Sequence, residues 1–174
     1  MDRKKLQDAV AALKKKGTVQ VPLVVAGEHV RTSKKNQNTH ELTSKINNSS
    51  ILTQHNPSSH ADVVAKYSNA SPADVKKAID SALEAKPAWE SLPFAERAAV
   101  FLKAADLIST KYRYDIMAAT MVGQGKNAWQ AEIDSAAELC DFLRFNVKYA
   151  QETYGVQPTH NSPGVWKYVC FCSN

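Results

Sequence analysis

One loop in this sequence has residue types and a spacing that could bind phosphate. Gly123-Gln124-Gly125-Lys126-Asn127 combines two glycines with a lysine. A Walker loop, however, needs a glycine five residues before its Gly-Lys pair and a Ser or Thr after the lysine, and Thr120 and Asn127 occupy these positions. The flanking residues are also helical in pattern on both sides. We therefore predict a corner between two helices, where glycine adopts the left-handed backbone at little cost.

Two further residues on the helix after this loop could carry chemistry. Glu138 lies between Ala137 and Leu139, at the edge of an apolar stripe, and the pattern alone favours a solvated helix face for it. Cys140 lies on the stripe itself, where a cysteine behaves as a small hydrophobe. We expect Cys140 to be part of the core and not a nucleophile.

The remaining cysteines and the histidines do not predict a metal site. Cys170 and Cys172 have strand spacing, none of the five histidines pairs with another ligand at zinc-finger spacing, and the sequence contains no H-E-x-x-H. Three cysteines are too few for a disulfide framework and are typical of a reducing compartment.

Composition excludes some classes of function. A chain of 174 residues with 44% hydrophobic residues is typical of one globular domain. The net charge is +5, but the densest basic run, Lys14-Lys15-Lys16, ends a predicted helix, where the helix dipole favours cations. No nucleic-acid recognition module accompanies the charge. No apolar run approaches about 18 residues, so we predict no membrane span.

The N-terminal elements are predicted from their periodicity and turn residues. Residues 1–17 form a surface helix with Leu6, Val10 and Leu13 facing inward. Residues 19–25 and 29–32 form a β-hairpin, in which Pro22 indicates an edge or a bulge. Residues 33–59 are polar and without period, which favours a disordered insert.

Four helices and a strand follow the insert. Residues 62–67 read as a short strand. Ser71, Pro72 and Asp74 have the spacing of a capped helix start, and Pro87 ends that helix. A second helix begins at Pro93, and a third covers residues 112–121. The long helix covers residues 127–154. The predicted buried residues of these helices are Val75, Ala78, Ile79, Ala82 and Leu83 in the first, Phe94, Ala98, Phe101, Leu102, Ala105 and Ile108 in the second, and Ile133, Ala136, Ala137, Cys140, Leu143, Val147 and Ala150 in the last.

The chain is thus predicted to be mostly α with a small β-hairpin element. Its parts are an N-terminal helix and hairpin (1–32), the polar insert (33–59), a helical part (60–154) and an irregular tail (155–174).

Four segments together resemble one family. They are VPLVV at 21–25, FLKAADL at 101–107, TMVGQGK at 120–126, and residues 130–146 with QAEID, AAEL and RFN. The set resembles the N-terminal part of Δ1-pyrroline-5-carboxylate dehydrogenases, which belong to the aldehyde dehydrogenase superfamily, and the fungal members most. The resemblance covers most of residues 2–166 outside the insert.

The resemblance implies an NAD-dependent oxidation of L-glutamate γ-semialdehyde to glutamate in proline degradation, through a cysteine nucleophile and a glutamate base. It implies an N-terminal fragment of the α/β aldehyde dehydrogenase fold and a location in the mitochondrial matrix, or in the cytoplasm if Met1 is the native start. It places Glu138 in the wall of the aldehyde pocket, near the substrate's amino group, and residues 19–32 among the oligomerisation elements.

The family's catalytic motifs lie beyond residue 174, namely S-P-F-N, K-P-S, the glycine-rich NAD turn, E-x-G-G-K and G-Q-K-C-S. We therefore expect a truncated dehydrogenase that is not catalytic and binds neither NAD nor a metal. The alternative is an interaction module that associates with full-length subunits through residues 19–32 and exposed helix faces.

Two segments look foreign to the family, residues 34–53 and 168–174. Ser33-Lys34 and Lys167-Tyr168-Val169 can both be encoded by codons that resemble splice donors. The hypothesis is that both segments are translated introns, and the spliced transcript would test it.

Overall fold

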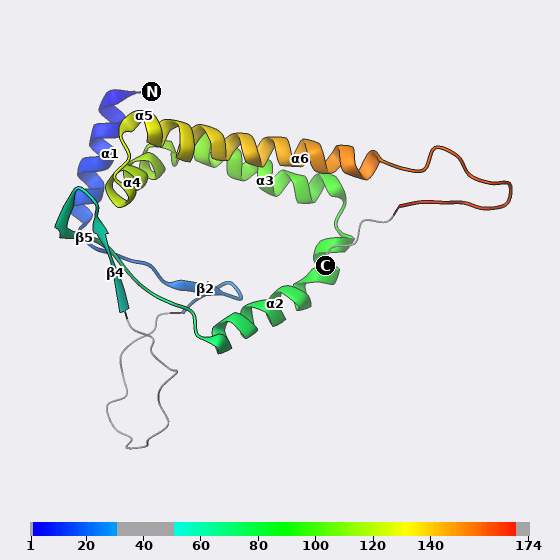
Figure 1. Ribbon diagram of the computed structural model, residues 1–174, viewed down its shortest axis with the longest axis horizontal. Coiled ribbons are helices and arrows are strands. Elements are labelled where there is room, and N and C mark those ends of the chain that lie inside the picture. Colours follow the sequence, from blue (N-terminus) through cyan, green and yellow to red (C-terminus); the bar gives the residue numbers. More distant parts are fainter. Residues whose placement is uncertain (1, 31–50, 170–174) are drawn as a thin grey trace, which may run out of the picture.

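The computed structural model describes residues 2–30 and 51–169 and is predominantly helical. The elements, in chain order, are α1 (Arg3–Lys16), β1 (Val19–Gln20), β2 (Leu23–Val25), β3 (Glu28–Val30), β4 (Ile51–Asn56), β5 (Ser59–Ser68), α2 (Pro72–Ser91), α3 (Phe94–Ser109), α4 (Arg113–Gln124), α5 (Ala128–Ala131), the π-helix η1 (Glu132–Glu138) and α6 (Leu139–Gly155). Helices with two small sheets confirm the predicted fold class (Figure 1).

The main core lies where α1 and α4 meet the start of the long helix formed by α5, η1 and α6. Leu6, Met117, Ala131 and Ala136 are buried there. The partly buried residues packed against them are Val10, Tyr114, Met121 and Ala128. The prediction for α1 is confirmed, since Leu6 is buried, Val10 packs on this core and Leu13 is half-buried.

A second interface joins α3 to α6, which run side by side (Figure 1). Ala98, Ala105 and Cys140 are buried along it, and small residues let two helices approach closely. At its far end the rings of Phe94 and Tyr154 meet edge to face, with 5.5 Å between centroids. The expected burial of residues 101 and 102 is wrong, because both side chains are 44% exposed.

The strand predicted over residues 62–67 is confirmed as part of β5, but the predicted hairpin over residues 19–32 is divided between two sheets. β2 and β3 form the hairpin through Ala26 and Gly27, whose φ angles of 54° and 78° suit a tight two-residue turn. β1 instead runs parallel to β5 in a three-stranded sheet of order β1-β5-β4. The chain leaves one sheet for the other at Pro22, which has no N–H for a ladder. Arg31 and Thr32 lie outside the described residues.

The prediction of disorder over residues 33–59 is wrong for its last part. β4 pairs antiparallel with β5, and Leu52 lies opposite Tyr67. A turn closes the pair, with the Ser58 N–H donating to Asn56 Oδ1 at 2.9 Å. Polar composition misleads here because the ladder with β5 supplies the hydrogen bonds that the isolated segment lacks. Residues 33–50 of the predicted insert lie outside the described residues.

α2 begins as predicted but does not end as predicted. Ser71 Oγ accepts from the Asp74 N–H at 3.2 Å, and Asp74 Oδ2 accepts from the Ser71 N–H at 2.8 Å, which completes the capping box. The helix continues through Pro87 to Ser91. The predicted break is wrong, because good helix formers flank Pro87 and the loss of one N–H does not end the helix.

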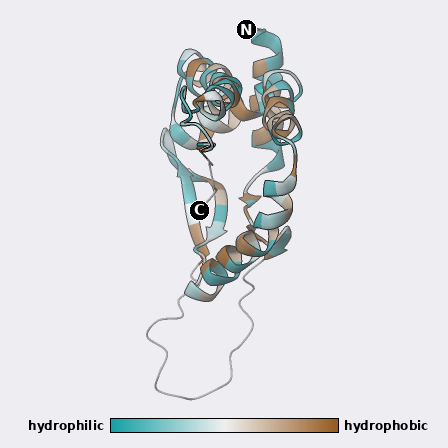
Figure 2. Cartoon of the chain, turned by 90° about the vertical axis from the view of Figure 1, so that its right-hand side faces the viewer, coloured by the Kyte–Doolittle hydropathy of each residue, from teal (hydrophilic) through white to brown (hydrophobic). Residues whose placement is uncertain are grey.

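α2 stands apart from the other helices (Figure 1) and buries no residue. Val75, Ile79 and Leu83, which were expected to face a core, are 48%, 54% and 58% exposed. The hydropathy colouring of Figure 2 shows hydrophobic residues along this helix among hydrophilic ones. An ion pair, Lys77 Nζ to Glu28 Oε2 at 3.4 Å, links α2 to the hairpin. α2 therefore presents an apolar face to solvent.

After α6, residues 156–169 form neither helix nor strand and are exposed. Among the described residues, none of the helices has the length and apolar character needed to cross a membrane.

The capping box predicts a local pH dependence. Hydrogen bonds from the Ser71 side chain and backbone hold the pKa of Asp74 below its ordinary value. A carboxylate whose pKa is lower in the folded state stabilises that state above its unfolded pKa, near 3.8, and this stabilisation is lost as pH falls through the lower folded pKa. We expect the first turn of α2 to fray in that pH range. The NMR chemical shifts of the Ser71 and Val75 amides measure this fraying.

Asp74→Ala should remove this transition, whereas Asp80→Ala, which changes an exposed carboxylate on the same helix, should leave it in place. An amide transition that persists in Asp74→Ala would contradict the assignment.

Candidate functional site

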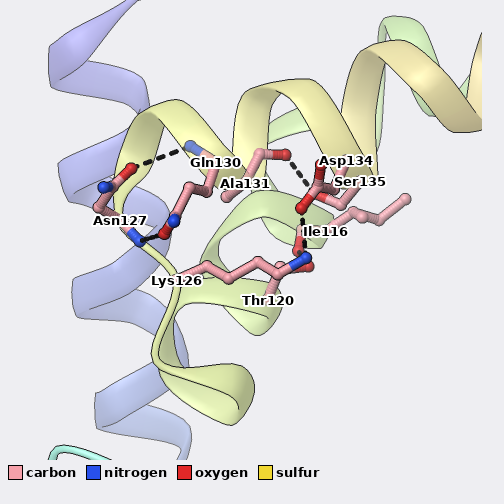
Figure 3. A network of polar contacts seen from close by, with 8 residues as sticks. All are labelled: Ile116, Thr120, Lys126, Asn127, Gln130, Ala131, Asp134 and Ser135. Carbon is pink, nitrogen blue, oxygen red and sulfur yellow. Dashed lines mark hydrogen bonds and ion pairs between the residues drawn. The ribbon is translucent and has the colours of Figure 1, made fainter.

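The loop at residues 123–127 is a corner between two helices, as predicted (Figure 3). Gly125 ends α4 in the left-handed conformation, with φ of 70°, and its N–H donates to the Met121 carbonyl at 3.1 Å. Asn127 then caps the next helix: its Oδ1 accepts from the Gln130 N–H at 2.9 Å, and Gln130 Oε1 accepts from the Asn127 N–H at 3.0 Å. Gly125 therefore shapes the turn, whereas Gly123 lies within α4, and the phosphate-loop interpretation stays rejected.

Two ion pairs fix the long helix beside this corner. Lys126 pairs with Asp134 (Figure 3). Arg113 on α4 pairs with Glu132 on η1, and both side chains are largely buried. The one lysine of the loop is thus engaged by a carboxylate of its own chain, which leaves it poorly suited to hold an anionic ligand.

The seven residues of η1 form a π-helix, which the sequence reasoning missed. The buried alanines Ala131 and Ala136 are five residues apart, and Ser135 Oγ donates to the Ala131 carbonyl at 2.5 Å. A stripe of period 3.6 would have buried Ile133 and Ala137, but both are exposed, so this part of the prediction is wrong. π-Helical turns occur frequently at functional sites, because they re-aim the side chains that follow.

The side chains that follow η1 form a distinct exposed face. Glu138 is exposed at the end of η1, and Phe142, Phe145 and Tyr149 follow it at steps of four, three and four residues. Such steps place all four on one face of a helix. The three rings are 56%, 49% and 54% exposed, and those of Phe145 and Tyr149 stack with 6.2 Å between centroids. We call these four residues the Glu138 face.

A carboxylate beside aromatic rings can recognise a cationic group. The carboxylate accepts hydrogen bonds from an ammonium, and ring faces attract a cation and pack against alkyl groups. The Glu138 face thus has the chemistry that the resemblance implies for a pocket wall near an amino group. The assignment of Glu138 to a substrate pocket stays a prediction.

The described cysteine is not placed to react. Cys140 is 2% exposed, and its Sγ lies 3.5 Å from the Ala105 carbonyl oxygen across the α3–α6 interface. Its prediction as a core residue is confirmed. Cys170 and Cys172 lie outside the described residues. Across residues 2–30 and 51–169, no three or more His, Cys, Asp or Glu side chains gather as metal ligands would.

Comparisons with known proteins define the class. The model of the aldehyde dehydrogenase family matches residues 45–171. The Δ1-pyrroline-5-carboxylate dehydrogenase of Emericella nidulans, named as mitochondrial, is 60% identical over 97% of this chain and 26% of its own length. The probable Δ1-pyrroline-5-carboxylate dehydrogenase of Schizosaccharomyces pombe is 49% identical over 95% of this chain and 27% of its own length.

A solved structure agrees with these relatives. The Δ1-pyrroline-5-carboxylate dehydrogenase of Mycobacterium tuberculosis, in a crystal structure bound with NAD, has a TM-score of 0.78 and 38% identity over 94% of this chain and 28% of that one. The chain thus spans about a quarter of the length of the relatives it matches.

The chain belongs to the aldehyde dehydrogenase family. Within that family it is similar to the Δ1-pyrroline-5-carboxylate dehydrogenases, with a fungal relative 60% identical, as the sequence motifs indicated. The family match covers residues 45–171, so it extends into both segments that look foreign to the family, and their origin as translated introns stays a prediction.

The burial of Cys140 predicts slow thiol chemistry. The test uses a variant with Cys170→Ser and Cys172→Ser, in which Cys140 is the remaining thiol. In the folded variant, Cys140 should react with a disulfide reagent on the order of a hundredfold more slowly than in the same variant unfolded in urea. The reason is that reaction requires local opening of the α3–α6 interface, which costs ~2.7 kcal/mol or more.

A matched control moves the thiol by half a turn. Phe142→Cys, made with Cys140→Ser in the same background, places the thiol on the exposed Glu138 face and should react at the rate of a free thiol. Equal rates for the two positions would contradict the buried location of Cys140.

Proposed function

We propose that these 174 residues form the helical and β-hairpin part of an NAD-dependent L-glutamate γ-semialdehyde dehydrogenase of proline degradation, and that they do not catalyse the reaction by themselves. The supporting observation is the similarity to Δ1-pyrroline-5-carboxylate dehydrogenases, which extends over nearly the whole of this chain but only about a quarter of theirs.

The chemistry of aldehyde oxidation supports the second part of the proposal. The reaction needs a thiolate nucleophile, a base and NAD held together at one site. The motifs that the resemblance assigns to these groups do not occur in the 174 residues. The described thiol, Cys140, is enclosed between α3 and α6 and cannot meet a substrate. NAD binding by this part alone is therefore not expected.

The role proposed for this part is to position the pocket wall. The product of the reaction, glutamate, retains an α-ammonium group, which a carboxylate recognises well. Glu138 is exposed and flanked by Phe142, and the core at Ala131 and Ala136 fixes the helix that carries it. We assign Glu138 to the ammonium group and not to a proton-transfer step.

Exposed apolar surface supports an association role as well. α2 buries none of its residues, and contiguous apolar faces of this kind mark interaction sites. We propose that α2, with the hairpin it contacts, docks against other parts of a dehydrogenase subunit or against full-length subunits. The mitochondrial names of several relatives support a mitochondrial location.

Turnover by the purified chain tests the proposal. With L-glutamate γ-semialdehyde and NAD, no NADH formation above the protein-free rate is expected, because losing the groups that act as a unit abolishes nearly all rate enhancement. The full-length Emericella nidulans relative serves as the positive control. Saturable NADH formation by the 174-residue chain, lost in Cys140→Ser, would overturn both the proposal and the structural role of Cys140.

A further inference from the structure

A groove of about 330 Å³ opens between α3 and α6, near the end of α2. Its volume lies within the range of about 300–1,000 Å³ that is usual for small-molecule sites. Aromatic and aliphatic side chains form most of its wall, chiefly Trp89, Phe94, Phe101, Leu143, Val147 and Tyr154. The groove uses a different face of α6 from the Glu138 face, so it is independent of the proposed substrate wall.

Among the described residues that line the groove, Arg97 carries the one charge. Its guanidinium carbon lies 5.8 Å from the centroid of the Tyr154 ring, which is a cation–π contact. Its Nε is shielded from solvent and has no hydrogen-bond partner within the part of the chain that the structure describes. Buried donors in most proteins are paired with a protein group, an ordered water or a ligand, so the unpaired Nε can donate to one further acceptor.

We propose that this groove binds a small carboxylate that carries a flat apolar ring. A guanidinium offers a planar fork that matches a carboxylate through two parallel hydrogen bonds, and a small turn of the Arg97 side chain would bring Nε into such a pair. The rings of Trp89, Phe94 and Tyr154 supply flat surfaces for the apolar body of the ligand. Phosphate fits less well, because one cation among aromatic walls does not replace its hydration.

Tryptophan fluorescence can report the binding of a ligand in the groove. Its three tryptophans are Trp89, Trp129 and Trp166, and the last two are 70% and 85% exposed. Trp129→Phe with Trp166→Phe should leave the fold intact and make Trp89, on the groove, the single source of tryptophan emission. 4-Bromobenzoate is the probe, since its bromine quenches nearby emission, and 4-bromobenzamide is the neutral probe of the same shape.

We expect saturable quenching of Trp89 by 4-bromobenzoate and at least about tenfold weaker binding of 4-bromobenzamide, since a bidentate charged pair typically contributes at least that factor. Arg97→Met should lower the affinity for 4-bromobenzoate to that for 4-bromobenzamide. Arg144→Met is the matched control, because Arg144 lies on α6 and contacts Ser109 instead of the groove, and it should retain the affinity.

Three results would overturn the proposal. They are quenching without saturation, equal affinity for the two probes, and equal loss in Arg97→Met and Arg144→Met. The comparison of carboxylate with amide uses unchanged groove residues, so it decides the question even if Arg97→Met fails to fold.

Discussion

The arrangement of this chain depends on the close packing of two alanines, Ala131 and Ala136, against Leu6 and Met117. Both alanines are fully buried, and no larger side chain would allow α1, α4 and the long helix to meet so closely. Because the alanines are five residues apart, the helix between them must take a π turn. With this turn, Glu138 at the end of η1 is exposed and Cys140, two residues later, faces α3.

Much of this could be predicted because it is encoded locally. The cap at Ser71 and Asp74, the left-handed Gly125 and the helix start at Asn127 each depend on residues a few positions apart. The errors occur where contacts between residues far apart in the sequence determine the secondary structure. β4 forms because β5 pairs with it, and β1 joins β5 across more than forty residues of sequence. Residues 133 and 137 follow the expected stripe by pattern, but packing at Ala136 turns them to solvent.

The sequence predicted only part of the Glu138 face. Glu138 itself was singled out, while Phe142, Phe145 and Tyr149, which share its face, were not. These residues follow one another at steps of four, three and four, which is the spacing of one helix face. The apolar stripe on the same helix has the same kind of spacing, so the sequence does not separate the exposed face from the buried one. Aromatic residues that remain exposed on one face are informative, since they mark a surface where a substrate or another part of a protein binds.

The central claim is that this part of a dehydrogenase positions a carboxylate for the substrate's ammonium group. The most direct measurement uses a chimera, in which these residues replace the corresponding part of the full-length Emericella nidulans relative. In the chimera, Glu138→Gln should lower kcat/KM for L-glutamate γ-semialdehyde by about tenfold or more and leave kcat/KM for butanal unchanged, since a hydrogen bond to a charged group typically contributes about 1.5–3 kcal/mol. Equal losses for the two aldehydes, or no loss for either, would contradict the claim.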